Sequence, residues 1–353
     1  MSEIHRILSR WYAQRCHDGE ADLSIERHFD GPFAWTYQDH PVYFVRIRKK
    51  TAPRRRELVL KICDTAESAE EEFRTLERLN EHSRNVDSSL GVPVPLAIFP
   101  GLPGLLMSRV TGKRLTRVLW PSVRAPDRQQ METAIDAVRG AASWLAAYQR
   151  TPCHSEKVHE LRGSTWLGEV QGYLRDHLDI CRRQGLNSRM VRSIDTWLDC
   201  IGDAFSDITC ACVPAFDYQP THIFVSEGKT SVIDFEDLSC GWPGENLASF
   251  LAYCQIYKTG IFRVALPLEN LRSIFLGHYA SQAEFGPTQM MSLEIAFLLE
   301  LLETFLRPWV DEDLTWLKNK ASYWRSWLAK REMIRRTTTG RWQTVLGDES
   351  RKI

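Results

Sequence analysis

The chain has 353 residues, enough for two domains or one large two-lobed unit, and its 43% hydrophobic and 25% charged content is ordinary for a globular protein. Lys and Arg total 45, as do Asp and Glu, so the net charge of zero gives no general electrostatic case for binding nucleic acid. It also gives no support to a strongly cationic substrate, although a local acidic pocket would not show in the total.

The first part of the chain predicts a helix, then strands, then a second helix. Residues 4–14 place apolar side chains on one side of a helix, and residues from about 23 to 62 predict strands. Within them, Val42–Arg48 and Glu57–Ile62 are apolar, β-prone runs on either side of a basic loop. Residues 67–81 return to helical spacing, with one apolar stripe.

A change in composition then marks a domain boundary. Prolines and glycines interrupt residues 92–104, and Leu105–Gly112 is an apolar strand that runs into a polar linker. We place the boundary near Ser108–Gly112, which divides the chain into an N-terminal lobe of residues 1–110 and a C-terminal lobe of residues 111–353.

Beyond the linker the pattern is largely helical. Amphipathic segments are predicted at residues 128–150, 166–181, 188–205, 245–257, 271–279 and 290–307. The most apolar segment, Leu293–Leu306, contains Glu294, Glu300 and Glu303 and is too short to span a bilayer. We therefore expect it to be a core helix and expect no membrane span.

The cysteines favour a reducing compartment. Nine of them are scattered from Cys16 to Cys254, without a common zinc spacing, and Cys210 and Cys212 are too close together for one. The start of the chain shows no targeting segment. We expect reduced, mostly buried thiols in a cytoplasmic protein.

The most informative stretch is residues 213–237. It places Asp217 and Asp234 seventeen residues apart, at the two ends of a predicted hairpin whose turn is Glu227-Gly228-Lys229. Two acids that a hairpin brings together among apolar neighbours usually hold a metal ion or a proton in transit. The alternative is a pair of loop aspartates that cap turns.

This stretch resembles the catalytic segment of the aminoglycoside phosphotransferase and choline kinase group, distant relatives of protein kinases. The family pattern is approximately His-Gly-Asp-x-x-x-x-Asn, a hairpin, Ile-Asp-Phe/Trp-Glu-Asp, a Gly-rich turn and Asp-Leu-Ala. The matching residues are Ala215-Phe216-Asp217, His222, Ile233-Asp234-Phe235-Glu236-Asp237, Gly241-Trp242-Pro243-Gly244 and Asn246-Leu247-Ala248. The resemblance implies an α+β, bilobal protein-kinase-like fold: a small antiparallel sheet with one main helix, then a larger, mostly helical lobe carrying the catalytic hairpin.

The resemblance also implies roles for individual residues. Asp217 would be the catalytic base that orients the acceptor hydroxyl, and Asp234, with His222, would hold the metal beneath the nucleotide phosphates. Lys61, near a strand end, and Glu72, eleven residues later at the edge of the helix stripe, would be the phosphate-binding lysine and its ion-pair partner. Further nucleotide contacts would come from Met107 and Ser108 at the hinge, and from Phe224 and Ile233 in the hairpin.

The chain departs from the pattern at four positions. Ala215 and Phe216 replace the family's His-Gly, His222 replaces its metal-binding Asn, and Asn246 replaces its later Asp. Imidazole is a poor partner for hard Mg²⁺, so Mn²⁺-assisted chemistry, single-metal chemistry or a lost reaction becomes more plausible, and His222 is either a ligand or a packed side chain. The region that would cover the phosphates, residues 28–36, has one glycine.

These observations predict a phosphotransferase that uses ATP (or GTP) with Mg²⁺ or Mn²⁺ and acts on a hydroxyl of a small molecule. The alternative is a catalytically silent kinase-like protein that binds a nucleotide or a protein partner. The acceptor pocket is expected within about residues 120–207, where no motif names the acceptor, and the oligomeric state is left open.

Overall fold

The computed structural model describes residues 2–15, 21–27, 41–49, 55–85, 90–99, 101–120, 127–152, 160–205, 209–235, 239–258 and 267–310. The chain divides into two compact units. Unit 1 comprises Met1–Lys113 with Phe224–Glu236, and unit 2 comprises Arg114–Ile223 with Asp237–Ile353. Asp234 therefore belongs to unit 1 and Asp217 to unit 2. The segment predicted to cover the phosphates, residues 28–36, lies outside the described residues.

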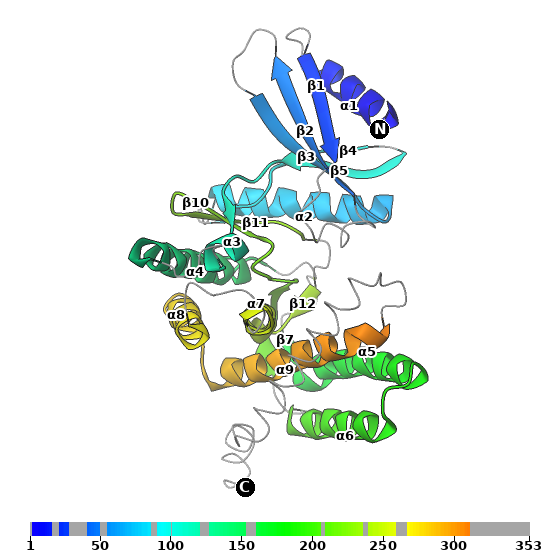
Figure 1. The fold of residues 1–353 in the computed structure, drawn as a ribbon, viewed down its shortest axis with the longest axis vertical. Coiled ribbons are helices and arrows are strands. Elements are labelled where there is room, and N and C mark those ends of the chain that lie inside the picture. The colour runs from blue at the N-terminus through cyan, green and yellow to red at the C-terminus, as the bar shows by residue number, and fades with distance from the viewer. Residues whose placement is uncertain are drawn as a thin grey trace. The chain divides into compact units, whose positions relative to one another are not determined.

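Unit 1 is built on a five-stranded antiparallel sheet with the strand order β1-β2-β3-β5-β4 (Figure 1). Its strands are β1 (Ala21–Arg27), β2 (Val42–Lys49), β3 (Arg55–Ile62), β4 (Pro95–Phe99) and β5 (Leu102–Ser108), and its helices are α1 (Ser2–Arg15) and α2 (Ala66–Asn85). The predicted small sheet with one main helix is confirmed, and α1 is the helix predicted at residues 4–14.

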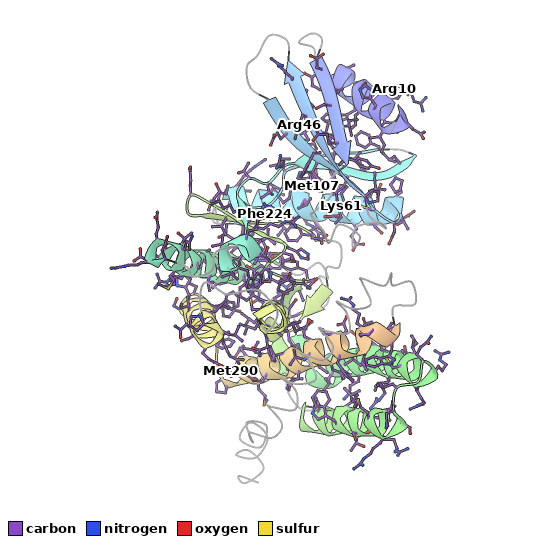
Figure 2. All side chains as sticks on the ribbon, viewed as in Figure 1. Arg10, Arg46, Lys61, Met107, Phe224 and Met290 are labelled. Atoms are coloured by element: carbon purple, nitrogen blue, oxygen red, sulfur yellow. The ribbon has the colours of Figure 1, made fainter. Side chains whose placement is uncertain are left out.

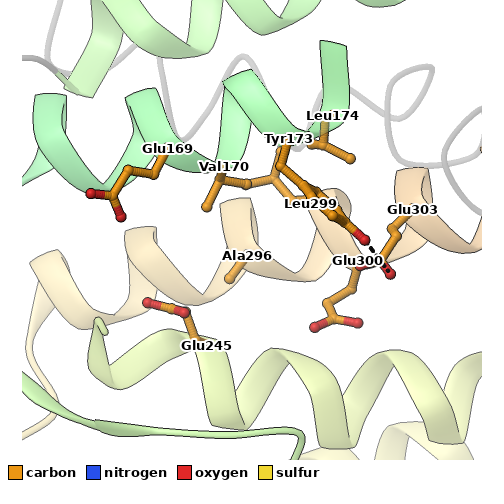
Figure 3. A pocket seen from close by; sticks show the side chains of 9 residues that line it. All are labelled: Glu169, Val170, Tyr173, Leu174, Glu245, Ala296, Leu299, Glu300 and Glu303. Atoms are coloured by element: carbon orange, nitrogen blue, oxygen red, sulfur yellow. Dashed lines mark hydrogen bonds between the residues drawn. The ribbon is translucent and has the colours of Figure 1, made fainter. Parts of the chain in front are cut away.

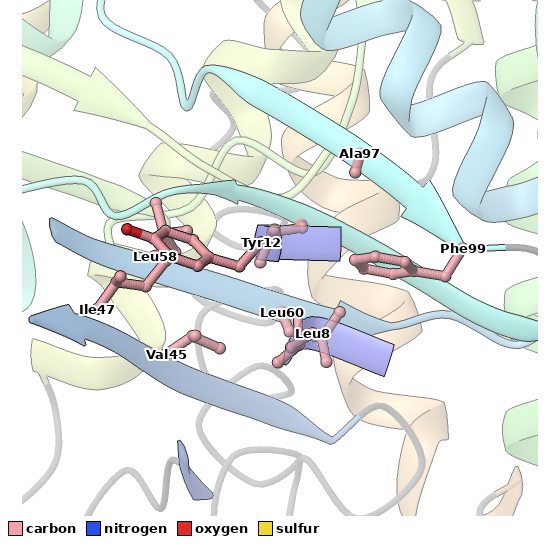
Figure 4. Close-up of a cluster of buried hydrophobic side chains, with 9 residues drawn as sticks. Leu8, Tyr12, Val45, Ile47, Leu58, Leu60, Ala97 and Phe99 are labelled. Atoms are coloured by element: carbon pink, nitrogen blue, oxygen red, sulfur yellow. The ribbon is translucent and has the colours of Figure 1, made fainter. Parts of the chain in front are cut away.

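Helix α1 packs its apolar side chains against one face of this sheet. The buried cluster consists of Leu8, Tyr12, Val45, Ile47, Leu58, Leu60, Ala97, Phe99 and Leu106 (Figure 4). Side chains alternate between the two faces along a strand. Because Leu58 and Leu60 belong to this cluster, Val59 and Lys61 of the same strand lie on the opposite face, together with Met107, which is paired with Val59.

The predicted hairpin is formed by β10 (Ile223–Ser226) and β11 (Lys229–Val232). Its two connecting residues, Glu227 and Gly228, have φ of 44° and 79°, and a two-residue type I′ turn requires positive φ at both positions. Strand β6 (Lys113–Arg114) joins them in a sheet of order β11-β10-β6. Gly112 precedes β6 with φ of 116°, and a Cβ there would lie 2.6 Å from the Val225 carbonyl oxygen, so only glycine fits this approach.

Unit 2 is mostly helical. Its helices are α3 (Leu115–Leu119), α4 (Arg128–Gln149), α5 (Gly163–Arg183), α6 (Ser188–Phe205), α7 (Pro243–Lys258), α8 (Leu268–Ala280) and α9 (Pro287–Val310). Two short strand pairs accompany them: β7 (Glu160–Arg162) with β8 (Thr209–Ala211), and β9 (Val213–Ala215) with β12 (Ser239–Gly241). Helix α7 packs against α9, α4 against α8, and α5 against α6 and α9.

The apolar centre of α9 is the predicted core helix, with Leu293, Leu301 and Leu302 fully buried. None of the described helices is long and apolar enough to cross a membrane. The described part of the chain has five free cysteines. Cys63, Cys181 and Cys254 are buried, whereas Cys212 and Cys240 are half-buried.

Candidate functional site

The polar centre of unit 1 is Lys61 on β3 (Figure 2). Its Nζ lies 3.1 Å from Oε2 of Glu72 on α2 and donates a hydrogen bond of 2.7 Å to Oδ1 of Asp234, which follows β11. Lys61 is 8% exposed and Glu72 2% exposed. A buried ammonium group is stable only when it is paired, so the two carboxylates hold this lysine in the low-dielectric interior.

Asp234 has a strained backbone. Its φ of 74° is in the left-handed region, which is uncommon for a residue other than glycine but is tolerated by the short polar side chain of Asp. The next residue, Phe235, is buried, whereas the Asp234 side chain is 35% exposed. Strain of this kind persists where the surroundings enforce it, and it gathers at functional sites. Here it presents a carboxylate to Lys61 and to solvent.

The other predicted nucleotide contacts also belong to unit 1. Met107 is buried in β5, on the face of the sheet that carries Lys61, while Phe224 on β10 and Ile233 after β11 are half-buried. Ser108 ends β5, where its backbone N–H donates to the Val94 carbonyl and its Oγ accepts from the Val94 N–H, each at 2.8 Å. The backbone N–H and the hydroxyl of Ser108 are thus both hydrogen-bonded to Val94, and its contact with a nucleotide stays a prediction.

In unit 2, both oxygens of the Asp217 carboxylate accept hydrogen bonds. Oδ1 accepts from Oγ of Ser249 on α7 at 2.8 Å, and Oδ2 accepts from Nε2 of Gln219 at 2.7 Å. Asp217 itself is exposed. The structure therefore holds a carboxylate in a fixed orientation and leaves it open to solvent.

Asn246, at a position where the family has Asp, anchors the strand before Asp217. Its Oδ1 accepts from the Phe216 N–H at 3.0 Å, and its Nδ2 donates to the Pro214 carbonyl at 2.9 Å. An ionised Asp could accept the first bond but could not donate the second. The substitution thus replaces a buried charge with a neutral side chain that satisfies two backbone groups.

Phe216 replaces the family's Gly and is held by aromatic packing. The centroid of its ring lies 4.9 Å from the ring centroid of Tyr148, 5.6 Å from that of Tyr218 and 6.1 Å from that of Trp144. Each of these pairs is arranged edge to face. Such pairs add stability beyond the area that they bury. The aromatic contacts with α4, together with Asn246, fix the backbone next to Asp217.

His222 closes the loop that begins at Asp217. Its Nδ1 lies 2.9 Å from the Asp217 carbonyl oxygen, and its backbone N–H donates to the Gln219 carbonyl at 2.9 Å. Since a carbonyl only accepts, Nδ1 must carry the proton, which places a lone pair on Nε2 of the neutral ring. The role of His222 as a metal ligand stays a prediction.

A pocket of about 300 Å³ lies between α5, α7 and α9 in unit 2 (Figure 3). Four carboxylates line it, Glu169 from α5, Glu245 from α7, and Glu300 and Glu303 from α9. Its apolar wall is formed by Val170, Leu174, Ala296 and Leu299, and Tyr173 completes it. The volume is that of a small ligand, and the acidic lining favours a cation.

Burial and like charges act strongly within this pocket. Burial, followed by the charges of Glu303, Asp217 and Glu245, raises the pKa of Glu300 well above its ordinary value, while Arg307 opposes the shift. The Asp217 carboxylate is thus one of the negative charges that favour a protonated Glu300. Within the described part of the chain, the Glu300 carboxylate has no hydrogen-bond or ion-pair partner, whereas Glu303 accepts from the Tyr173 hydroxyl at 3.3 Å.

The pocket also affects the pKa of the Tyr173 hydroxyl. Burial and the charge of Glu303 raise the pKa of its hydroxyl to about 12, so it stays a hydrogen-bond donor at neutral pH. The sequence alone does not indicate any of these pocket residues as a ligand. In the sequence, Glu300 and Glu303 are only charged residues within an apolar helix. Their spacing on α9 would have given a clue, since residues three apart share a helix face.

The model of a family described as "Phosphotransferase enzyme family" matches residues 37–273, more than half of the chain. No curated protein sequence matches the chain.

Several solved structures are similar to it. A choline kinase from Cryptosporidium parvum Iowa II has a TM-score of 0.62 at 15% identity, with 99% of each chain covered. A choline/ethanolamine kinase family protein from Mesorhizobium loti gives 0.57 at 12% identity, covering 93% of this chain and 94% of the other. An ethanolamine kinase from Plasmodium vivax gives 0.53 at 12%, covering 87% and 81%. At these identities the likeness concerns the fold, and it confirms the protein-kinase-like α+β fold expected from the sequence.

Proposed function

Because the chain belongs to the phosphotransferase enzyme family, we propose that it transfers a phosphoryl group from a nucleoside triphosphate to a hydroxyl of a small cationic molecule. The observation that carries this proposal is the pocket of about 300 Å³ lined by glutamates, which lies in unit 2 as Asp217 does. Phosphoryl transfer requires positioning and charge neutralisation more than covalent participation, and these residues can supply both.

In unit 1, Lys61 would bind the phosphates of ATP or GTP, and Asp234 would hold the metal ion. A carboxylate oxygen suits Mg²⁺, which is commonly bound by one or two carboxylates together with substrate phosphates and water. When bound, such an ion neutralises charge on the β- and γ-phosphates. The Nε2 lone pair of His222 would suit Mn²⁺ better than Mg²⁺.

Lys61 and Glu72 are expected to act as a unit in nucleotide binding. We expect Lys61→Met and Glu72→Gln each to weaken ATP binding, and the double variant to lose less than the sum by about 1–2 kcal/mol, because each single change removes the same contact. Dissociation constants from titration calorimetry measure this coupling.

A control double-mutant cycle uses Arg74 and Glu70. These residues form an exposed ion pair of 2.5 Å on α2, the helix that carries Glu72. Arg74→Met and Glu70→Gln should leave ATP binding unchanged, singly and together, since exposed pairs contribute little. Strict additivity at Lys61 and Glu72 would contradict their joint role.

For the acceptor, we propose an amino alcohol or a larger molecule that carries one. Several similar structures are named for choline and ethanolamine kinases, whose acceptors join a hydroxyl to a cationic nitrogen. The pocket supports the same class in this chain. The carboxylates would attract the cation, the apolar wall would contact its carbon atoms, and Asp217 would accept the hydroxyl hydrogen.

A transfer assay with matched acceptors tests the proposal. ATP and GTP, each with Mg²⁺ or Mn²⁺, are incubated with choline, ethanolamine and the uncharged choline isostere 3,3-dimethylbutanol. We expect kcat/KM for a cationic alcohol to exceed that for its neutral isostere by about 10–100-fold, the range that a contact with a charged group of about 1.5–3 kcal/mol gives. Equal turnover of the charged and neutral alcohols would overturn the cationic class.

The raised pKa of Glu300 predicts a pH-dependent stability. As pH rises above the ordinary glutamate value of 4.5, the unfolded chain loses this proton while the folded protein keeps it, so the protein binds more protons folded than unfolded and loses stability. We therefore expect Glu300→Gln to raise the Tm at pH 8 by a few degrees (about 2–4 °C per kcal/mol), with little change near pH 4.5.

The same variant should change choline binding little, because Glu300 keeps its proton in the folded protein and has no charge to lose. Glu169→Gln is the matched control at an exposed position of the pocket, and we expect no pH-dependent gain in its Tm. If Glu300→Gln changed the Tm equally at both pH values, the raised pKa of Glu300 would not affect the stability of the protein.

A further inference from the structure

We propose that Ser249 is a positioning residue for phosphoryl transfer: its buried hydroxyl on α7, together with Gln219, clamps the Asp217 carboxylate in one orientation. The proposal rests on the function proposed for Asp217. It adds a role at a position that the motif itself does not include.

The geometry of the clamp is simple. Ser249 Oγ donates to Oδ1 at 2.8 Å and Gln219 Nε2 donates to Oδ2 at 2.7 Å, so each oxygen has a donor of its own. Two donors on two oxygens fix the rotation of the carboxylate about its last bond. Each oxygen keeps a further lone pair, which leaves the exposed side of the group able to accept a hydrogen from a hydroxyl.

The Ser249 hydroxyl bonds outside its own helix, as does that of Ser143 on α4, whose Oγ lies 2.9 Å from Nε2 of His278. Serines and threonines in helices usually satisfy themselves by donating to the carbonyl four residues earlier. Within the described helices, the hydroxyls of Thr133, Ser193, Thr196 and Thr304 do so. Ser249 is 4% exposed and donates instead to the carboxylate of a residue 32 positions away, which is Asp217.

Helix α7 holds both parts of the Asp217 segment. Asn246 and Ser249 are three residues apart and thus share one face of the helix. Asn246 binds the backbone at Pro214 and Phe216, and Ser249 binds the carboxylate that follows. Because α7 packs against α9, both contacts come from a helix in the interior of unit 2, as a preorganised group requires.

Ser249→Ala tests the clamp by a split between kcat and KM. We expect kcat to fall about 10–100-fold, as is typical when a supporting hydrogen bond is lost, while the KM values for nucleotide and acceptor stay within about twofold. Ser249→Thr restores the hydroxyl and should recover most of kcat. Gln219→Leu removes the second donor without touching α7 and should show the same split, so it tests the clamp even if Ser249→Ala folds poorly.

The matched control is Ser292→Ala. Ser292 is also buried in unit 2, but its hydroxyl donates to the Gln289 carbonyl on its own helix. We expect this variant to keep the wild-type kcat. If Ser249→Ala kept kcat within twofold, or if Ser292→Ala lost as much, the positioning role would be overturned.

Asp217→Asn separates this inference from the proposed function. An inactive Asp217→Asn together with a fully active Ser249→Ala would overturn the role of Ser249 alone. A fully active Asp217→Asn would overturn the function assigned to Asp217, and the role of Ser249 with it.

Discussion

Asp234→Asn is expected to abolish metal-dependent binding of ATP or GTP and to leave the protein folded. The substitution removes one negative charge and keeps the size of the side chain. Asn is also among the residues that best tolerate positive φ, so the backbone at φ of 74° should be undisturbed. Lys61 keeps its second partner, Glu72, at 3.1 Å. The change therefore isolates the carboxylate charge that a metal ion would need.

The measurement is the dissociation constant of a non-hydrolysable ATP analogue, with Mg²⁺, with Mn²⁺ and with EDTA. We expect affinity in the presence of metal to fall by about 100-fold or more, at least the loss typical of a supporting residue around a metal, and affinity in EDTA to change little. Asp22→Asn, at an exposed position of β1 in the same unit, is the matched control and should behave as wild type. Unchanged metal-dependent binding in Asp234→Asn would show that Asp234 is a structural turn residue.

The sequence was informative wherever local pattern determines structure. The hairpin was predicted from two β-prone runs and a turn. The structure has both strands, and both connecting residues have positive φ. The Lys61–Glu72 contact was implied by the resemblance to the kinase family, and it forms at 3.1 Å. That these residues bind phosphate stays a prediction, because the contact also satisfies a buried lysine.

Residues that only tertiary packing brings together could not be found in this way. The carboxylates of the pocket lie on α5, α7 and α9, and more than 130 residues separate Glu169 from Glu303. The acceptor pocket was expected within about residues 120–207, whereas the pocket that we propose for the acceptor also takes residues from the later helices α7 and α9. The zero net charge concealed this local acidity, since charges elsewhere cancel it in the sum.

The departures from the family motif also needed the structure. From the sequence, Asn246 suggested a lost function. In the structure its amide donates one bond and accepts another, which a carboxylate could not do. Ser249 carried no signal by itself, because a serine in a helix usually bonds to its own helix.

Asp217→Asn is expected to lower kcat for transfer to a cationic alcohol by about 10³-fold, within the range that a general base contributes. The introduced amide has one acceptor oxygen in place of two. Gln219 Nε2 only donates, whereas the Ser249 hydroxyl can also accept, so the amide should place its oxygen toward Gln219 and its nitrogen toward Ser249. The segment should therefore stay folded, while the group that accepts the hydroxyl hydrogen loses its negative charge.

Steady-state kinetics and nucleotide binding together decide the outcome for Asp217. Binding of the ATP analogue should stay within a few-fold of wild type, because Lys61, Glu72 and Asp234 all lie in unit 1. Asp176→Asn, an exposed position on α5, is the matched control in unit 2 and should keep full turnover. Turnover that survives Asp217→Asn would contradict the role of general base. A wild-type protein that binds the nucleotide tightly but phosphorylates none of the cationic alcohols would instead favour the silent, nucleotide-binding alternative. The intact Asp217 carboxylate would then support no phosphoryl transfer.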